Sequence, residues 1–377
     1  MSFSLCLLAA AVMAACGGGT STEEPTVLAE SEVAGEDHAA QPMDADPNAV
    51  SIDQPVDNFA DASNPDPTMR AQSLASGFVD SSAVFIDTSL IPLGSTGSSV
   101  DIVRSTTELP VPTEGGAFRT TCRYSHMASD DPIVFPNQPG RSHLHTFFGN
   151  TGTNADSTAS SLQTSGNSTC RGGTVNRTAY WVPSMIDTRT GAPVKPKDSQ
   201  FYYKNGHKGI VPSSVRPMPD GLRMIAGDPK NAAPVGPFYY NCKRGSNVKE
   251  IPNCSVGADV YQNITFPQCW DGVNLDSPDH KSHMAYHTKG VCPSTHPVIL
   301  PEVTFRIIYA VTEEDAPLHW RLSSDAYDRS LPAGYSSHGD WFNGWKRDVS
   351  HSWATNCIAA SKDCHSHLLG DGRKISF

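Results

Sequence analysis

The sequence predicts a mainly-β fold: a single sandwich or jelly-roll-like domain with long loops and disulfides, preceded by a disordered acidic tether. From about Phe118 onward, short apolar or alternating runs are interrupted every few residues by Gly, Pro, Asn or Asp. No window of a dozen residues shows a clean helical period. The 29 prolines favour the same fold, because proline breaks helices but is tolerated in loops and at strand edges.

Composition divides the chain near residue 110. We expect a lipoprotein-type signal peptide over 1–15, a mostly disordered Pro/Ser/Ala-rich acidic linker over 16–110, and the mainly-β domain over 111–377, with its core at 118–345. The first 110 residues hold 16 acidic and two basic residues, a charge of 2 − 16 = −14, whereas the remainder carries 26 − 23 = +3. The net charge of −11 therefore belongs to the tether and gives no reason to expect a nucleic-acid partner.

The N-terminus is a short apolar run that ends in small residues before Cys16. This pattern is typical of a bacterial lipoprotein signal, with cleavage before Cys16 and a lipid on its sulfur, although no Lys or Arg precedes the apolar run. The run is too short to span a bilayer permanently. We expect an extracytoplasmic protein held at the cell envelope by an N-terminal lipid only, with plain secretion as the alternative.

Five segments of the predicted domain read as strands, because apolar, aromatic and β-branched residues are enriched between turn residues. They are 179–182, 200–204, 222–226, 237–240 and 303–311. Within the linker, 83–87 and 100–103 are also compatible with strands, but Ser and Gly surround them.

Eight cysteines remain after Cys6 and Cys16 are set aside. Outside the cytoplasm an even number implies disulfides, whose pairing a sequence alone does not fix. Pairing of neighbours is the simplest arrangement, since each bond then closes a modest loop: Cys122–Cys170, Cys242–Cys254, Cys269–Cys292 and Cys357–Cys364.

The segment Arg141–Gly149 contains the first candidate site, a His-Leu-His run. In an extended segment His143 and His145 lie on one face, about 7 Å apart along the strand, and converge on one ion or ligand. The alternative is that both rings only bond to backbone groups.

The segment 266–309 has the highest density of ionisable side chains, with four histidines and three aspartates between Cys269 and Cys292 or just beyond. Ionisable groups are costly to bury without partners, which favours a site. The candidates here are Asp279 as an acid/base, His283 and His296 as metal ligands, and Trp270 and Asn274 as substrate-binding residues. The alternative is an ordered loop in which aspartates cap their own backbone.

The third candidate is the run from Ser336 to Trp345. His338 and Asp340 are candidate proton-transfer residues, and Trp341, Asn343 and Trp345 are candidates for binding a sugar, because aromatic faces stack on sugars and amides hold hydroxyls. The alternative places the aromatic residues in the core.

Motifs for serine hydrolase, nucleotide and dinucleotide chemistry are absent: the sequence has no GxSxG elbow, no P-loop and no GxGxxG. Six motifs in order instead resemble the secreted-protein family called domain of unknown function nineteen ninety-six, over approximately Phe118 to Trp345. The motifs are the Asp130–Val134 run with the following His-Leu-His, Arg171–Pro183, Gly221–Asp228, Cys269–His283, Cys292–Pro297 and His338–Gly344. Members of this family are sometimes joined to glycan-binding modules, so the resemblance implies a polysaccharide or cell-wall glycan as partner and supplies no catalytic residues.

Two functions therefore compete. The first is a cell-envelope or secreted carbohydrate-active enzyme, a polysaccharide hydrolase or lyase, in which His143, His145, Asp279, His338 and Asp340 carry the chemistry. In its metal-assisted variant, His143 and His145 bind zinc or calcium with a third ligand from His283, His296 or His338. The second is a non-catalytic glycan- or metal-binding lipoprotein. A disulfide-stapled scaffold without a site is the remaining alternative.

Overall fold

The structure is a computed structural model and describes residues 83–377. The predicted signal peptide, Cys16 and the predicted tether as far as residue 82 lie outside the described residues. The described residues belong to one compact unit, 48–377. Their fold is mainly β, as the sequence predicts, and none of their helices is long and apolar enough to cross a membrane.

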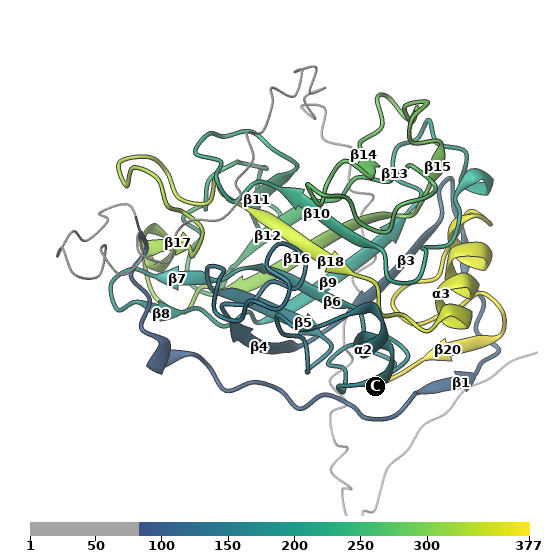
Figure 1. Ribbon diagram of the computed structural model, residues 1–377, viewed down its shortest axis with the longest axis horizontal. Coiled ribbons are helices and arrows are strands. Elements are labelled where there is room, and N and C mark those ends of the chain that lie inside the picture. Colours follow the sequence, from purple (N-terminus) through teal and green to yellow (C-terminus); the bar gives the residue numbers. More distant parts are fainter. Residues whose placement is uncertain (1–82) are drawn as a thin grey trace, which may run out of the picture. The chain divides into compact units, whose positions relative to one another are not determined.

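Two large sheets form the body of the domain (Figure 1). The five-stranded sheet has the order β10-β18-β6-β5-β4, with β10 (Arg223–Gly227), β18 (His338–Phe342), β6 (Ala179–Pro183), β5 (His145–Gly149) and β4 (Tyr124–Ala128). The seven-stranded sheet has the order β11-β12-β16-β9-β3-β19-β2, with β11 (Phe238–Cys242), β12 (Asp259–Thr265), β16 (Glu302–Ala310), β9 (Asp198–Lys204), β3 (Ala117–Thr121), β19 (Lys362–Asp363) and β2 (Val111–Pro112).

Smaller elements surround the sheets. Two three-stranded sheets have the orders β14-β13-β15 and β17-β7-β8, with β14 (Met284–Ala285), β13 (Cys269–Trp270), β15 (Val298–Ile299), β17 (Trp320–Leu322), β7 (Met185–Asp187) and β8 (Ala192–Pro193). The helices are short: α2 (Ala159–Thr164), α3 (Arg347–Trp353), the 3-10 turns η1 (Thr88–Leu90), η2 (Pro212–Ser214) and η3 (Ala316–His319), and the π-helical turn η4 (Ala354–Ile358).

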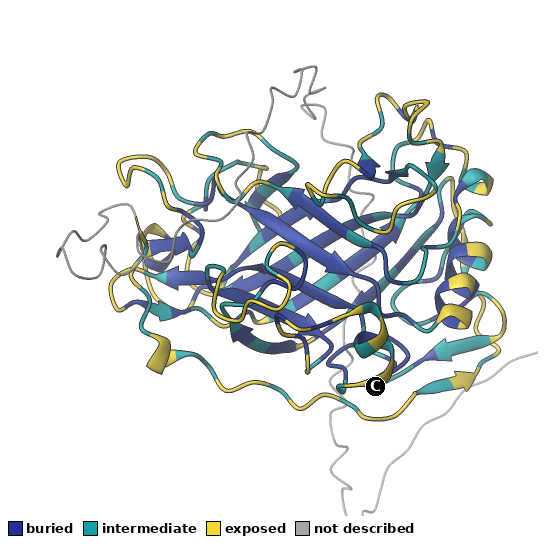
Figure 2. Ribbon diagram, viewed as in Figure 1, coloured by how far each residue is buried: buried dark blue, intermediate teal, exposed yellow. Residues whose placement is uncertain are grey.

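Both faces of the five-stranded sheet are buried. Successive side chains of each strand point to opposite sides, so each strand contributes residues to both faces. Tyr180 of β6 and Trp341 of β18 point toward the seven-stranded sheet, where the main core also holds Phe305. Trp181 and Phe342 point the other way, into a second apolar cluster that Ile133, Phe147, Leu162, Ala179 and Ile225 complete. Figure 2 shows both sheets as mainly buried and the exposed residues as mainly in loops. We call the face that carries Trp181 and Phe342 the outer face.

All five strand segments predicted for the domain lie in or overlap strands: β6, β9, β10, β11 and β16. The linker prediction differs from the structure over residues 83–110. This stretch contains η1 and β1 (Val103–Ser105), and β1 pairs with β20 (Arg373–Ile375) near the C-terminus. Backbone hydrogen bonds also join Ser98 to Ser168. Backbone pairing of this kind needs few apolar side chains, so the composition of the stretch does not indicate it.

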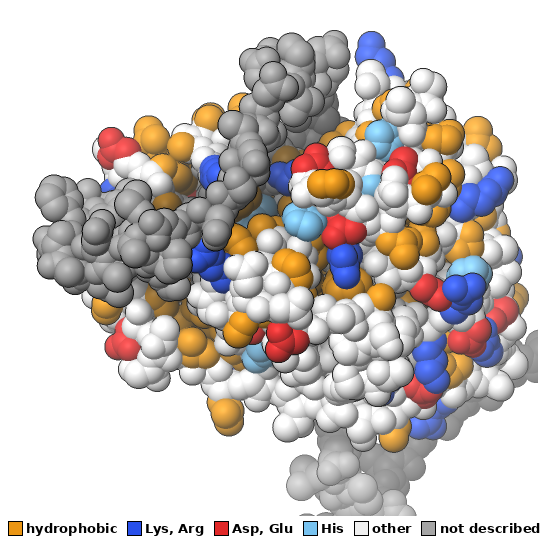
Figure 3. All heavy atoms as spheres, viewed as in Figure 1, with side chains coloured by type: hydrophobic (Ala, Val, Ile, Leu, Met, Phe, Trp, Pro, Cys, Tyr) orange, Lys and Arg blue, Asp and Glu red, His pale blue; other side chains and the backbone are white. Residues whose placement is uncertain are grey.

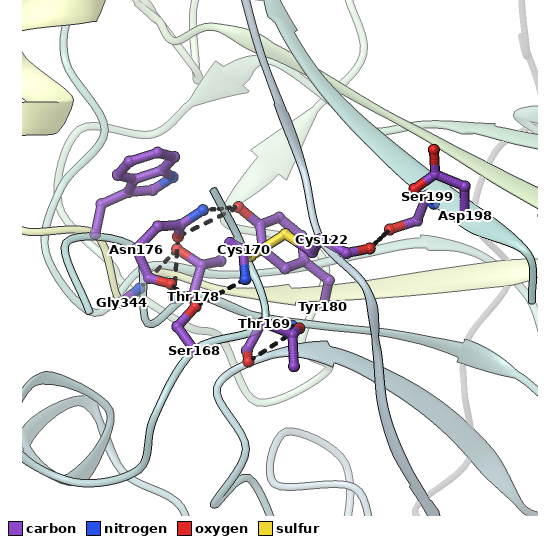
Figure 4. The surroundings of a disulfide bond; sticks show 12 residues. Cys122, Ser168, Thr169, Cys170, Asn176, Thr178, Tyr180, Asp198, Ser199 and Gly344 are labelled. Carbon is purple, nitrogen blue, oxygen red and sulfur yellow. Dashed lines mark hydrogen bonds between the residues drawn. A yellow bond between two sulfur atoms is a disulfide. The ribbon is translucent and has the colours of Figure 1, made fainter. Parts of the chain in front are cut away.

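The four disulfides have the predicted pairing of neighbours. Cys122–Cys170 joins the strand region after β3 to the loop before β6, and Figure 4 shows its surroundings. The Ser199 hydroxyl donates to the Cys122 carbonyl at 2.5 Å, and the Asn176 amide donates to the Tyr180 hydroxyl at 3.2 Å. Four disulfides are typical of proteins from oxidising compartments, so the domain is extracytoplasmic.

Candidate functional site

Three histidines from two distant parts of the chain meet on the outer face of the five-stranded sheet. His145 begins β5, His143 lies two residues before it, and His338 begins β18. The ring centroid of His143 is 4.2 Å from the ring centroid of His145 and 5.0 Å from that of His338. The centroids of His145 and His338 are 5.8 Å apart. The Nε2 atoms of His143 and His338 are 3.2 Å apart. One ligand nitrogen of each ring lies within 4.8 Å of the other two.

Strand register explains this convergence. His145 lies opposite Pro183 of β6, and His338 lies opposite Gly227 of β10. Because β6 lies between β5 and β18, the two histidines flank one strand on the same face. The sequence predicts His143 and His145 as a pair and His338 as one possible third ligand, and the structure brings these three together.

Two buried carboxyl groups extend the group of histidines. Asp340 lies two residues after His338 on β18 and therefore points to the same face. Asp131 lies in the loop that crosses this face, and its Oδ1 accepts the N–H groups of Ile133 and Val134, each at 2.9 Å. Ligand atoms of Asp131, His145 and Asp340 all lie within 4.8 Å of one another. We call Asp131, His143, His145, His338 and Asp340 the His/Asp cluster.

Burial shifts the protonation of the whole cluster. Desolvation lowers the pKa of His145 to about 3 and that of His338 to about 4, and it holds the pKa of His143 well below its usual range. Desolvation also raises the pKa of Asp131 to about 6 and raises the pKa of Asp340 well above its ordinary value, with the Asp131 charge acting in the same direction on Asp340. The three rings are therefore neutral at pH 7, and burial favours the protonated form of Asp340.

Hydrogen bonds to backbone carbonyls fix the tautomers of two of the rings. Nδ1 of His145 lies 2.9 Å from the Asp130 carbonyl oxygen, and Nδ1 of His338 lies 2.8 Å from the Ser336 carbonyl oxygen. A carbonyl oxygen only accepts, so each Nδ1 carries the hydrogen and each Nε2 keeps its lone pair. His145 Nε2 and Asp340 Oδ2 are buried and have no hydrogen-bond partner among the residues that the structure describes.

Part of the 266–309 segment lies beside the cluster. Asp276 accepts from Arg223 of β10 at 2.9 Å and contacts Nδ1 of His280 at 3.0 Å. The ammonium group of Lys281 donates to the Gly227 carbonyl at 2.9 Å, opposite His338 in the sheet, and its charge acts on His338 and Asp340. The Asp276–His280 pair and Lys281 therefore border the cluster without belonging to it.

Other residues of the segment fit the alternative of an ordered loop. Asp279 accepts from the Ser277 and Ser282 hydroxyls at 2.7 and 2.8 Å and from two backbone N–H groups, which hold its pKa well below its usual range. Asn274 donates to the Asp271 carboxylate, and its carbonyl accepts the Trp270 indole N–H at 2.6 Å. The loop therefore satisfies these side chains locally, as Asx-turns do.

His283 and His296 lie outside the cluster. His283 contacts the Ser277 hydroxyl at 2.9 Å and the Arg223 carbonyl at 2.7 Å, and His296 contacts the Thr295 hydroxyl at 2.8 Å and the Ser282 carbonyl at 2.9 Å. Both nitrogens of each ring thus have a protein partner. The prediction that either one supplies the third metal ligand does not fit this arrangement.

Trp341, Asn343 and Trp345 belong to the core. Both tryptophan rings are fully buried, and their indole N–H groups donate to the Tyr203 hydroxyl at 3.3 and 3.0 Å. The Asn343 amide donates to the Pro219 carbonyl at 2.7 Å. Neither indole offers a free face to a sugar, so the predicted stacking role does not fit their position. Trp341 alternates with outer-face residues along β18, and Asn343 and Trp345 follow the strand, so the sequence alone does not say which of these side chains are accessible.

Asp131 is the member of the cluster that sequence reasoning missed. It lies in the Asp130–Val134 run, close in sequence to the His-Leu-His run, and this proximity is the one available signal. The two carbonyl groups that orient His145 and His338 leave no trace in the residue types.

Comparison with known proteins gives one match. A family model described as a domain of unknown function (DUF1996) matches residues 131–345, a range that contains the whole cluster. No curated protein and no solved structure matches the chain significantly.

Proposed function

The chain belongs to the family described as a domain of unknown function (DUF1996), and we propose that it is an extracytoplasmic enzyme that cleaves a polysaccharide at the His/Asp cluster. One observation carries the proposal: five ionisable side chains from distant segments meet on one buried sheet face. Burying such groups costs free energy that an apolar face would not, and perturbed pKa values in a shared site are typical of catalytic residues.

The cluster contains the groups that cleavage of a glycosidic bond requires. Burial shifts the pKa of Asp340 upward and so favours its protonated form, which suits a general acid. His143 is the cluster member with a partly exposed side chain, whereas the other four are buried. His143 is therefore the group through which the cluster meets substrate, and the other four members are buried behind the surface.

A polysaccharide substrate is supported by the compartment and by the resemblance to secreted proteins that carry glycan-binding modules. On the face seen in Figure 3, acidic and basic side chains are interspersed among neutral and hydrophobic ones, which suits a neutral polymer better than a strongly charged one. Trp270 is the one predicted stacking residue with some exposed surface, and we assign sugar contact to it.

A lipid on Cys16 would hold this enzyme at the cell envelope. The full-length chain would then fractionate with membranes, and Cys16→Ser would release it into the soluble fraction without changing its specific activity. Recovery of the unaltered chain in the soluble fraction would favour plain secretion.

A non-catalytic binding protein is the second candidate, because the cluster offers five donors. These donors form two groups of three that share His145, and a metal held by such a group without an open position for water is structural.

A product screen separates the two candidates. The purified chain is incubated with plant, fungal and bacterial polysaccharides, and new reducing ends and unsaturated products are measured. We expect cleavage by the unaltered chain, its loss in His145→Ala and Asp340→Ala, and its retention in Asp279→Ala, the matched aspartate outside the cluster. Reducing ends without unsaturation indicate hydrolysis, and unsaturated ends indicate elimination. No product from any polysaccharide, or equal activity in all variants, would contradict the proposal.

A further inference from the structure

We infer that His143, His145 and His338 form a binding site for one divalent transition metal ion, with the Asp131–Asp340 pair beside it. The inference deepens the proposed function and rests on it for the catalytic role of the metal, whereas metal binding itself is measured separately.

The spacing of the ring nitrogens matches a shared metal. A zinc ion binds imidazole nitrogen at about 2.0–2.1 Å in a tetrahedral arrangement, which separates two ligand nitrogens by about 3.3 Å. The Nε2 atoms of His143 and His338 are 3.2 Å apart. One nitrogen of His145 lies within 4.8 Å of both, a separation that a small ring movement closes.

The hydrogen bonds of the rings match metal ligation as well. Metal-bound histidines usually donate their other N–H to a backbone carbonyl or a carboxylate, which fixes the ligating nitrogen as a lone pair. His145 and His338 do this through the carbonyls of Asp130 and Ser336. Their Nε2 atoms are therefore ready to bind a cation without losing a proton.

Two buried atoms without a partner lie at the same place. His145 Nε2 and Asp340 Oδ2 have no hydrogen-bond partner among the described residues, although both side chains are almost fully buried. A buried polar atom without a partner costs free energy, and a bound cation or water is one way to satisfy it. A cation here would satisfy the His145 nitrogen and would lie beside the two carboxyl groups.

The donor set selects the kind of metal. Calcium and magnesium prefer oxygen ligands, whereas imidazole suits zinc, copper, nickel and iron. Three histidines therefore favour a transition metal over calcium. The partly exposed position of His143 opens one side of the site, so a fourth position is accessible to water or substrate, as in catalytic zinc sites.

A second pair of neighbouring histidines serves as a control, because its Nδ1 atoms accept hydrogen bonds whereas those of His145 and His338 donate them. His207 and His287 have ring centroids 5.2 Å apart, but each Nδ1 accepts a backbone N–H, from Gly209 at 2.9 Å and from Gly290 at 3.1 Å. Their Nε2 atoms therefore carry the hydrogen in the neutral rings and are not available as ligands. Proximity of two rings alone does not make a site.

The test is titration of the full chain, stripped of metal by a chelator and dialysed, with ZnCl₂ alone and with CaCl₂ alone. We expect one Zn²⁺ per chain, no saturable Ca²⁺ binding at the cluster, and a loss of Zn²⁺ affinity of about 10-fold or more in His143→Ala. His143 is partly exposed, so this variant is the one least disruptive to the fold, and circular dichroism verifies folding. His287→Ala should bind Zn²⁺ as the unaltered chain does.

Electron paramagnetic resonance of the Cu²⁺-loaded chain identifies the ligands directly. The nitrogen hyperfine pattern should show three imidazole nitrogens in the unaltered chain and two in His143→Ala, and it should not change in His287→Ala. Absence of one-to-one Zn²⁺ binding, or binding that His143→Ala leaves unchanged, would overturn the inference.

The inference and the proposed function fail in different ways. A chain that binds one Zn²⁺ through these histidines but cleaves no polysaccharide keeps the metal site and removes the enzymatic proposal. Cleavage that persists in the stripped chain, with no dependence on added metal, keeps the enzyme and removes the metal site.

Discussion

Asp340 lies in the middle of β18, with its carboxyl group on the apolar outer face beside Trp181 and Phe342. Its side chain is buried, and burial raises its pKa well above the ordinary value. A residue that is costly to bury and is not needed for packing is expected to serve the chemistry of the site.

Asp340→Asn tests this role with little change of shape. The amide is neutral and similar in size, so we expect the melting temperature to stay the same or rise, since no ionisable group is then buried. Polysaccharide cleavage should fall by about 100-fold or more, because an amide does not transfer a proton. A variant that loses stability in proportion to activity would indicate a structural role for Asp340.

Asp279→Asn is the matched control at the residue scale. Asp279 lies outside the cluster and accepts hydrogen bonds from two hydroxyls and two backbone N–H groups of its own loop. We expect activity within about twofold of the unaltered chain and a loss of stability of about 1 kcal/mol from weaker capping bonds. Thermal denaturation and the product assay measure the two effects separately.

At this scale the sequence shows which residue types could serve a site, but it does not show which of them are buried in the core. The structure brings His143 and His145 together with His338, one of the three third ligands that the sequence offers, because strand alternation places the first two on one face. Trp341 and Trp345 look like sugar-binding residues by type, but they point into the core between the sheets. Which of two alternating faces is covered depends on partners hundreds of residues away, which no local pattern contains.

At the scale of elements, the loop from Asp276 to Lys281 borders the cluster through a pH-dependent contact. Hydrogen bonding to Asp276 raises the pKa of His280, and the contacts with His280 and Arg223 leave the pKa of Asp276 below its ordinary value despite desolvation. Asp131 also faces His280 and raises its pKa, whereas Arg223 lowers it.

The sign of the pH effect follows from these directions. The His280 contribution to stability is complete below the ordinary histidine pKa of 6.5 and is lost as pH rises through the raised value. The Asp276 contribution is present above the ordinary aspartate pKa of 3.8 and is lost as pH falls. The contact is therefore strongest between those two values. In an NMR titration, Asp276→Asn should lower the pKa of His280. An unchanged titration would show that the pair does not interact.

The disulfides should contribute unequally to stability. Cys122–Cys170 spans 48 residues of sequence, whereas Cys357–Cys364 spans seven. In the chain-entropy view the longer loop adds about 1.5 kcal/mol more than the shorter one. Replacing both cysteines of Cys122–Cys170 by Ala should therefore lower the denaturant midpoint more than the same change at Cys357–Cys364. The reverse order would show that native packing around the bonds outweighs loop closure.

Long apolar strands are predictable from their sequence, whereas paired but polar segments are not. β16 and β9 alternate or run apolar between turn residues and are found where the pattern predicts them. The stretch 83–110 has little apolar surface and is held by backbone pairing with β20 and with the loop around Ser168. Its partners lie far along the chain, so its Ser- and Gly-rich composition indicates a linker instead.

At the scale of the whole described domain, sheet order determines the site. β5 and β18 are separated in sequence by nearly the full length of the family match, yet only β6 lies between them in the sheet. The sequence predicts a mainly-β fold with disulfides but not this order, because long-range strand pairing leaves no local signal. The cluster therefore exists only in the folded domain.

A metal that binds only the folded chain must stabilise it. At a free concentration of about 1,000 times its dissociation constant, one bound ion adds about 4 kcal/mol to the free energy of unfolding. Zn²⁺ should therefore raise the melting temperature of the stripped chain, and a chelator should reverse the rise. His143→Ala should show a smaller rise, whereas His287→Ala should match the unaltered chain. An equal rise in all variants would place the ion elsewhere.

Anomalous diffraction from crystals of the Zn²⁺-loaded chain, recorded at the zinc absorption edge, tests the central claim most directly. The account predicts one strong anomalous peak at bonding distance from Nε2 of His143, His145 and His338, next to Asp340. A peak at another site, or none between these rings, would contradict it.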